Sequence, residues 1–360
     1  MDISKIDRNF KIENNIGEAD VAFYDVRQEP FELYGLYEPR QTAVFQRLPD
    51  EIGQNVSPGV AWLYQDTAGG RVRFCTDSRY VAIKVVTPSI CHMSHMPLSG
   101  SSGFDLYLDD PITESSLYVG AYRPTTEKQE SYEGKVVFKN RKMRYFTMNF
   151  PTYNHVNQLY IGLQEDATVA KGMPYKSVAP IVYYGSSITQ GGCSARPGNA
   201  YQAIISRRMN MDFLNLGFSG NGKAEEMMID YLAQLKMSVF VSDYDHNAPD
   251  VEHLKNTHCK LYERIRAAHP DIPYIMLSRP DYLRDISDGN ERRDVIIDTF
   301  RYARAQGDKN VYFIDGESLF RGPYANLCTV DGCHPTDMGF ALMADAIEHE
   351  LRVAFAEQYL

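Results

Sequence analysis

Apolar and polar residues alternate with a period of two along much of the first half of the chain. The segments 71–78 and 80–86 show the clearest stretches with this period. Further strands of this kind are predicted at 103–108, 117–122, 135–138 and 158–163. Turn residues separate these segments at short intervals and no helical pattern intervenes, which is typical of packed antiparallel sheets. We therefore predict an all-β sandwich of the jelly-roll type over residues 1–172.

The pattern changes after 171–180, a segment with one glycine and two prolines that we interpret as a linker. Apolar runs then precede longer helical patterns at 181–184, 212–216, 238–242, 273–277 and 310–314. In the first helical pattern Tyr201, Ile204, Ile205 and Met209 recur at helical spacing. Alternating strands and helices indicate a parallel sheet covered on both faces. Residues 173–360 are therefore predicted to form an α/β domain with a three-layer, doubly wound parallel sheet.

Polar residues follow the predicted strands of this second domain at regular places. Ser187 comes after the first strand, a glycine-rich loop at 217–222 after the second, and an acidic segment at 243–247 after the third. Asp331 and His334 follow the last strand. Ligands of open α/β sheets bind beyond the carboxyl ends of the strands, so we expect these residues to meet in one crevice.

A serine, a histidine and an aspartate are the groups that nucleophilic acyl chemistry needs. A hydroxyl nucleophile requires a base, and the base requires an orienting carboxylate. Ser187, His334 and Asp331 are the candidates, although a serine after a strand can also be a helix cap and an aspartate can also start a turn. The nucleophile elbow of α/β-hydrolases is a poor match, because it needs glycine two residues after the serine, where this chain has Thr189.

These residues resemble the four sequence blocks of the SGNH, or GDSL-type, hydrolases. The segment 185–189 resembles the first block with Ser187 at the nucleophile, and Gly220 matches the glycine of the second. Asn247 falls where the third block has its asparagine, and the pair Asp331 and His334 matches the last block. The resemblance implies an oxyanion hole formed by the N–H of Ser187, the N–H of Gly220 and the amide of Asn247.

The resemblance extends to the first half of the chain and includes two departures. Residues 103–107 resemble the Gly-x-Asp-Leu-Tyr signature of a β-sandwich domain that precedes some of these hydrolases. Ser186 stands where the family has an aspartate before the nucleophile, and 245–248 departs from the usual Gly-x-Asn-Asp. The aspartate before the nucleophile is not a triad member, so we expect the chemistry to survive its replacement.

Charge and composition exclude several partners and leave the compartment open. The formal net charge of −10 argues against nucleic acid or an anionic membrane as the main partner. An apolar run of about 18 residues, as a membrane span needs, is missing from the sequence. Residues 1–7 lack the apolar core of a signal peptide, so we expect a cytoplasmic protein, or a secreted one whose leader has been removed. The six scattered cysteines suggest free thiols, with a bridge between Cys193 and Cys333 left open.

We expect neither a metal nor an organic cofactor. The motif at 92–95 has two histidines but lacks the glutamate and the helical spacing of a His-Glu-x-x-His site. The loop at 217–222 lacks the Gly-x-Gly-x-x-Gly spacing of a dinucleotide site. Trp62, Tyr107 and Tyr118 can be interpreted as sugar-stacking platforms or as core residues.

The resulting hypothesis is a serine esterase that removes a small acyl group, above all acetyl, from a carbohydrate. The ester class rests on the triad and the carbohydrate on the resemblance to two-domain esterases. A thioesterase or another small-ester acylhydrolase uses the same chemistry, and a lipase is disfavoured because no amphipathic lid is visible. A glycan-binding protein with a degenerate hydrolase domain and a metal-dependent deacetylase are the rivals from other classes. The oligomeric state stays open.

Overall fold

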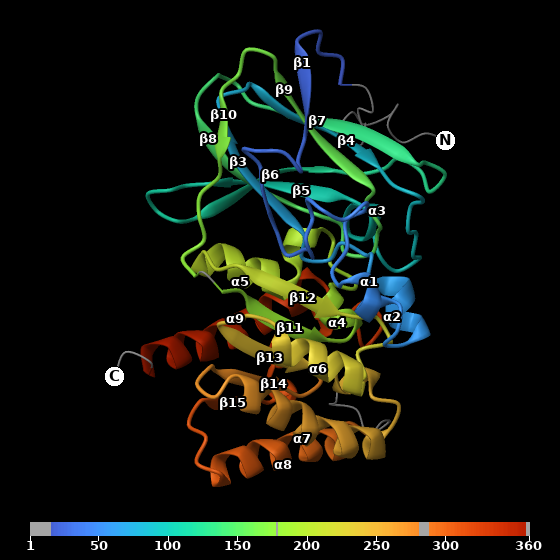
Figure 1. Ribbon diagram of the computed structural model, residues 1–360, viewed down its shortest axis with the longest axis vertical. Helices are drawn as coiled ribbons and strands as arrows, with labels where there is room; N and C mark the ends of the chain where they lie inside the picture. Colours follow the sequence, from blue (N-terminus) through green and yellow to red (C-terminus); the bar gives the residue numbers. More distant parts are fainter. Residues whose placement is uncertain (1–15, 178, 281–287, 358–360) are drawn as a thin grey trace. The chain divides into compact units, whose positions relative to one another are not determined.

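The computed structural model describes residues 16–177, 179–280 and 288–357. The chain forms two compact units (Figure 1). The sandwich unit comprises Met1–Gln46 and Gln65–Pro174, and the α/β unit comprises Arg47–Tyr64 and Tyr175–Leu360. The sequence-based division at 172/173 differs from this one chiefly in the segment 47–64. That segment joins the α/β unit because its apolar side chains Leu48, Val60 and Leu63 are buried in that unit's core.

The sandwich unit consists of two antiparallel sheets, as the alternating pattern predicted. Within the described residues their strand orders are β1-β9-β4-β7 and β10-β3-β8-β5-β6, with β2 paired to β3. The first sheet contains β1 (Val21–Asp25), β4 (Tyr80–Val86), β7 (Ser131–Val137) and β9 (Gln158–Gln164). The second contains β2 (Glu32–Tyr34), β3 (Arg71–Thr76), β5 (Phe104–Asp109), β6 (Ser116–Tyr122), β8 (Arg144–Asn149) and β10 (Val169–Lys171).

Alternate side chains of the two sheets form the core of this unit. Val81, Ile83 and Val85 of β4 are buried in it, whereas Lys84 between them is exposed. Phe74 and Phe146, from the neighbouring strands β3 and β8, pack with their ring centroids 5.3 Å apart. The strands that lack a clear alternation, among them β1, β2 and β10, were not predicted. The short helix α3 (Leu98–Ser101) was not predicted either.

The α/β unit contains a parallel sheet in the order β12-β11-β13-β14-β15, counted over the described residues. Its strands are β11 (Ile181–Gly185), β12 (Phe213–Gly217), β13 (Val239–Asp243), β14 (Tyr274–Leu277) and β15 (Val311–Ile314). Its helices are α1 (Asp50–Gly53), α2 (Pro58–Leu63), α4 (Ser187–Gln190), α5 (Tyr201–Met209), α6 (Glu226–Gln234), α7 (Val251–Ala268), α8 (Gly289–Ala305) and α9 (Asp337–Glu357). The predicted doubly wound, three-layer α/β fold is confirmed.

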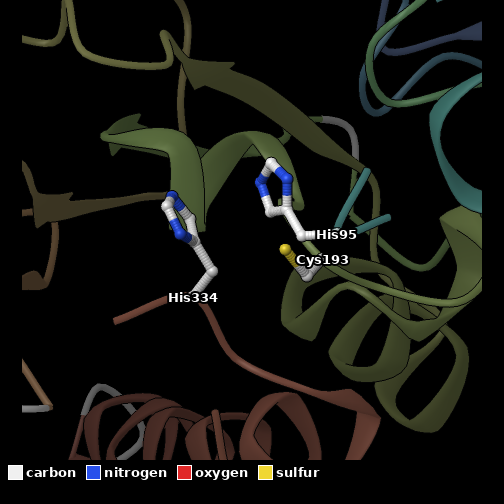
Figure 2. A group of neighbouring side chains, drawn as sticks. All are labelled: His95, Cys193 and His334. Atoms are coloured by element: carbon white, nitrogen blue, oxygen red, sulfur yellow. The ribbon is translucent and has the colours of Figure 1, made fainter. Parts of the chain in front are cut away.

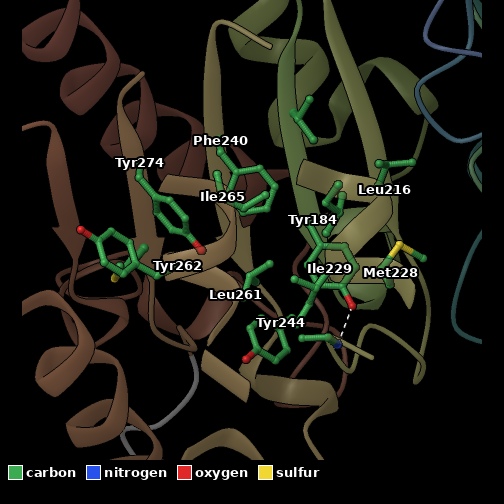
Figure 3. Close-up of a cluster of buried hydrophobic side chains, with 14 of the residues drawn as sticks. Tyr184, Leu216, Met228, Ile229, Phe240, Tyr244, Leu261, Tyr262, Ile265 and Tyr274 are labelled. Carbon is green, nitrogen blue, oxygen red and sulfur yellow. Dashed lines mark hydrogen bonds between the residues drawn. The ribbon is translucent and has the colours of Figure 1, made fainter. Parts of the chain in front are cut away.

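Helices cover both faces of this sheet, which explains why its strands are apolar on both sides. Ile181 and Tyr183 of β11 pack in a cluster with residues of α5 and α9. Val182 and Tyr184 of the same strand belong to the cluster with α6, α7 and α8. Figure 3 shows the second cluster, in which the Tyr184 hydroxyl accepts the N–H of Ala224 at 2.7 Å.

The strand order places a topological switch point at the carboxyl end of β11. β12 lies on one side of β11 and β13 on the other, so the chain winds in opposite directions from this strand. Gly185 pairs in register with Gly217 of β12 and with Asp243 of β13. The loops after these three strands therefore leave the sheet at the same level. None of the helices in the described ranges has the length and apolarity needed to cross a membrane.

Candidate active site

Ser187 lies at the first position of the short helix α4, directly after β11. Ser186 caps this helix, because its Oγ accepts the N–H of Ile188 at 3.2 Å. A serine therefore supplies the short polar side chain that the turn needs where the family has an aspartate. The N–H of Ser187 belongs to the first turn, whose N–H groups have no acceptor within the helix. Ser187 is buried, with 7% of its surface exposed.

Ser187, His334 and Asp331 are joined in a hydrogen-bonded chain. The Oγ of Ser187 lies 2.9 Å from Nε2 of His334, and Nδ1 of His334 lies 2.7 Å from Oδ2 of Asp331. The sequence placed these residues about 145 positions apart, and the structure brings them together. A hydroxyl that is hydrogen-bonded to an imidazole, which is in turn bonded to a carboxylate, is the arrangement that activates a serine.

The Asp331 carboxylate fixes the tautomer of the imidazole. Burial raises the pKa of Asp331, but hydrogen bonds from the His334 ring and from the N–H groups of His334 and Cys333 outweigh it and lower this pKa to about 2. An ionised carboxylate can only accept, so Nδ1 of His334 carries the proton and donates it to Asp331. Nε2 is then the acceptor for the Ser187 hydroxyl.

The turn that carries Asp331 and His334 is held by its own main chain. Oδ1 of Asp331 accepts the N–H groups of Cys333 at 3.0 Å and His334 at 2.8 Å. Gly332 has a φ of 89°, which a residue with a Cβ rarely adopts. This turn does not follow β15 directly, as the sequence suggested, because the segment 315–330 with two short 3-10 turns lies between them.

The glycine-rich loop lies directly on the end of β11. The N–H of Phe218 donates to the Gly185 carbonyl at 2.9 Å. A Cβ at Gly222 would lie 2.2 Å from the same carbonyl oxygen, so only glycine permits this approach. The N–H of Ser219 donates to Oε1 of Gln190 on α4, which ties the loop to the helix that carries Ser187. Gly220 stands at the exposed tip with a φ of 68°.

Asn247 lies in a 3-10 turn after β13 and faces the same loop. Its Oδ1 accepts the N–H of Gly222 at 3.2 Å, so its amide nitrogen points away from that residue. Arg292 of α8 holds the turn, because its Nη1 donates to the carbonyls of Asp245 at 2.7 Å and Ala248 at 2.9 Å. The three residues predicted for the oxyanion hole thus come from the loops after three adjacent strands.

A buried carboxyl group, Asp243, lies beneath the nucleophile turn. Its main-chain carbonyl accepts the N–H of Ser186 at 3.1 Å, and its Oδ2 accepts the hydroxyls of Thr189 and Tyr201. Burial, and after it the nearby carboxylate of Asp245, raise the pKa of Asp243 to about 8. The side chain is fully buried, so it supports the turn and does not contact substrate.

Cys193 lies beside the imidazole of His334 (Figure 2), with its Sγ within 4.8 Å of a ring nitrogen of that residue. Burial, with a smaller contribution from the Asp331 carboxylate, raises the pKa of the Cys193 thiol to about 11. A thiol of this kind is neutral near pH 7 and is a poor nucleophile. Cys193 and Cys333 are not joined by a disulfide, so the bridge left open by the sequence is not formed in the structure.

Arg47 supports the site and could not be found from sequence. Its buried guanidinium donates to the carbonyls of Gly217 at 2.5 Å, Leu63 at 2.7 Å and Asn215 at 3.2 Å. It also lies over the Phe218 ring, with 4.6 Å from Cζ to the ring centroid. Arg47 precedes the catalytic motifs by more than a hundred residues and belongs to no motif, so only the folded chain reveals its role.

The remaining candidates from the sequence are spread over both units. His92 lies at the surface beside Glu127, with 3.0 Å between Nδ1 and Oε2. Tyr107 is buried and packs against the ring of Tyr118, so it is a core residue. Trp62 is 77% exposed, which excludes the core interpretation for this side chain.

Family models match both halves of the chain. The GDSL-like lipase/acylhydrolase family matches residues 178–352, and a family described as the N-terminus of SGNH-hydrolase-type esterases (GxDLY) matches residues 21–169. No functionally curated protein sequence matches the chain.

Several solved structures share the fold over 80–93% of the chain. A Bacteroides ovatus protein assigned to the GDSL-like lipases is 26% identical, with a TM-score of 0.82 over 92% of this chain and 98% of its own. The salicylyl-acyltransferase SsfX3 from a tetracycline biosynthetic pathway is 18% identical, with a TM-score of 0.74 over 93% and 98%. A family two carbohydrate esterase from Clostridium thermocellum, solved with cellohexaose, is 15% identical, with a TM-score of 0.58 over 80% and 93%.

Proposed function

Because this chain belongs to the GDSL-like lipase/acylhydrolase family of ester-hydrolysing enzymes, we propose that it is a serine esterase with the triad Ser187, His334 and Asp331. Its substrate is a carbohydrate that carries a small acyl ester, above all acetate. The observation that carries the proposal is the hydrogen-bonded chain from Ser187 Oγ through the His334 ring to the Asp331 carboxylate. This chain gives the hydroxyl an acceptor for its proton and gives the acceptor a fixed orientation.

In the first half of the reaction Ser187 forms a bond to the acyl carbon of the ester. As the Oγ–C bond forms, the hydroxyl proton passes to Nε2 of His334, and the imidazolium is stabilised by the Asp331 carboxylate. The tetrahedral intermediate then collapses, the bond to the leaving alcohol breaks, and His334 returns the proton to the alcohol oxygen. The product of this half is an acyl-enzyme on Ser187 and a free hydroxyl on the sugar.

In the second half water replaces the alcohol. His334 takes a proton from water as the water oxygen attacks the acyl carbon, and Ser187 leaves with that proton. In both halves negative charge develops on the acyl oxygen. The N–H of Ser187, the N–H of Gly220 and the amide of Asn247 are the proposed donors to that oxygen, and loss of one such donor costs about 10²–10³ in rate.

A carbohydrate substrate is proposed from the likeness of the fold, which indicates a class of substrate and not a particular sugar. The chain shares its two-part architecture with carbohydrate esterases, one of which was solved with cellohexaose. The likeness to a salicylyl-acyltransferase favours a second candidate, in which an alcohol of a second substrate accepts the acyl group from Ser187 in place of water. Product analysis with an added acceptor alcohol distinguishes the two, because transfer yields a new ester and hydrolysis yields a free acid.

The test compares wild-type protein with Ser187→Ala and Ser318→Ala on p-nitrophenyl acetate. Ser318 is an exposed serine of the same unit and serves as the matched control. We expect Ser187→Ala to lower kcat by at least about 10³, Ser318→Ala to match wild type, and a fluorophosphonate to label wild type but not Ser187→Ala. Persistent activity in Ser187→Ala contradicts the assignment of the nucleophile. Loss of activity with a chelator, together with full activity of Ser187→Ala, would indicate a metal-dependent deacetylase. If wild type shows neither labelling nor turnover, the protein is a binding protein.

A further inference from the structure

Trp62 stands on a helix that is firmly anchored in the α/β unit. Val60 and Leu63 of α2 are buried in the core of that unit, and Oγ of Ser57 caps the helix by accepting the Val60 N–H at 3.3 Å. The anchored helix nevertheless leaves Trp62, the single tryptophan of the chain, 77% exposed. Tryptophan is highly buried on average in folded proteins, whereas here a fixed helix holds the indole at the surface.

Helix α2 runs directly against the loop that carries Gly220. A Cβ at Gly59 would lie 1.9 Å from Oδ1 of Asn221, the residue that follows Gly220. Trp62 is three residues after Gly59, and residues three apart lie on one helix face with about 5–6 Å between their Cβ positions. The helix that carries Trp62 therefore borders the loop that contains Gly220 and Asn221.

An exposed indole at this place suits one ligand class. The two faces of a pyranose ring carry C–H groups, which pack on the flat, electron-rich face of an aromatic ring, while the indole N–H can bind a hydroxyl. We propose that Trp62 is a sugar-stacking platform that binds the ring of the acylated carbohydrate and so determines specificity. This inference rests on the proposed function, because it assumes that Gly220 lies at the oxyanion site.

The first experiment separates sugar recognition from ester chemistry. The variants Trp62→Ala and Trp62→Phe are compared with wild type on a fully acetylated methyl xyloside and on ethyl acetate, whose leaving group is too small to span the platform. We expect Trp62→Ala to lower kcat/KM on the acetylated sugar about tenfold, mainly through KM, and to leave ethyl acetate within twofold. Trp62→Phe keeps a ring and should retain most of the activity on the sugar.

The matched control is Tyr302→Ala, which removes a half-exposed ring from α8. Tyr302 packs against Tyr262, whose hydroxyl donates to Asp308 just before β15, so it lies toward the opposite end of the sheet. We expect no effect of this variant on either substrate. Equal losses on both substrates in Trp62→Ala, or no loss on either, overturn the proposal.

A binding experiment distinguishes failure of this inference from failure of the proposed function. In Ser187→Ala, the fluorescence of the single tryptophan is titrated with methyl xyloside and with cellohexaose. We expect a saturable change with at least one of these sugars, and the same change when the control substitution Tyr302→Ala is added to Ser187→Ala. A saturable change without any esterase activity in wild type supports the sugar-binding role of Trp62 and contradicts the proposed esterase function. Esterase activity without any change in fluorescence contradicts the sugar-binding role of Trp62 and supports the proposed esterase function.

Discussion

Replacement of Asp243 by asparagine is expected to make the protein more stable at pH 8 but not at pH 4. Asp243 is fully buried at the end of β13, and its Oδ1 has no hydrogen-bond partner in the described part of the chain. Its Oδ2 accepts the hydroxyls of Thr189 at 3.1 Å and Tyr201 at 3.2 Å. These two bonds lower the pKa of Asp243, but burial and the carboxylate of Asp245 outweigh them and raise it to about 8.

The sign of the effect follows from proton linkage. In the unfolded chain Asp243 titrates near 3.8, whereas in the folded chain its pKa is about 8. Between these values the folded protein binds one proton more than the unfolded protein, so the free energy of unfolding falls as the pH rises. Each pH unit between these two pKa values lowers the free energy of unfolding by at most about 1.4 kcal/mol, so the whole range sets an upper limit of about 6 kcal/mol. Relaxation of a buried site reduces such values, and we expect about 2–4 kcal/mol.

The assay is urea unfolding of wild type and Asp243→Asn at several pH values from 4 to 8. The fluorescence of Trp62 reports on the α/β unit, since this unit contains the single tryptophan. The stability of the variant relative to wild type should grow steadily with pH. Asp298→Asn, at a 74% exposed side chain on α8, is the control and should differ from wild type by less than about 0.5 kcal/mol. If the stabilities of wild type and Asp243→Asn follow parallel curves over this range, the buried carboxyl is not protonated and the reasoning fails.

Three further substitutions test the supports of the site. Arg47→Met removes the donor to the Gly217 carbonyl, so urea unfolding should show a free energy of unfolding that is lower by about 2–4 kcal/mol, and kcat should fall. An unchanged stability would contradict this supporting role of Arg47. Tyr184→Phe leaves the Ala224 N–H without its acceptor and should cost about 1–2 kcal/mol in the same assay, with a smaller loss speaking against the bond. Asp331→Asn should lower kcat about 10⁴-fold. Because the pKa of Asp331 is about 2, wild-type activity should show no inflection from this group above pH 4, and an inflection that vanishes in the variant would refute this.

The sequence predicted the α/β architecture well because its strands carry a strong local signal. The five apolar runs of the second half coincide with β11 to β15 to within a residue at each end. In the sandwich unit the prediction found the strands with a clear alternation and missed short edge strands such as β2 and β10. An edge strand of three residues contains too few positions to show a period, so its existence is decided by tertiary pairing.

The division of the chain could not be predicted for a related reason. The segment 47–64 contains the two short helices α1 and α2, whose four and six residues are below the length at which a helical period is visible. Its destination depends on contacts with residues far along the chain, such as the bond from Arg47 to Gly217. Such contacts leave no pattern in a single sequence, whereas the spacing of Asp331 and His334 is local and was visible.

The two loops that contain Gly220 and Asn247, the residues proposed for the oxyanion hole, share a construction that links these observations. Each loop is held by a buried arginine from a distant segment, Arg47 at the end of β12 and Arg292 at the turn after β13. In each case one planar guanidinium donates to two or more main-chain carbonyls, which a lysine could not do with the same rigidity. Donors that are fixed before the substrate binds stabilise the transition state without reorganisation, so their supports contribute to kcat more than to KM. Substitution of either arginine should therefore lower kcat and leave KM nearly unchanged. Substitution of Trp62 should instead raise KM for the acetylated sugar and leave kcat nearly unchanged.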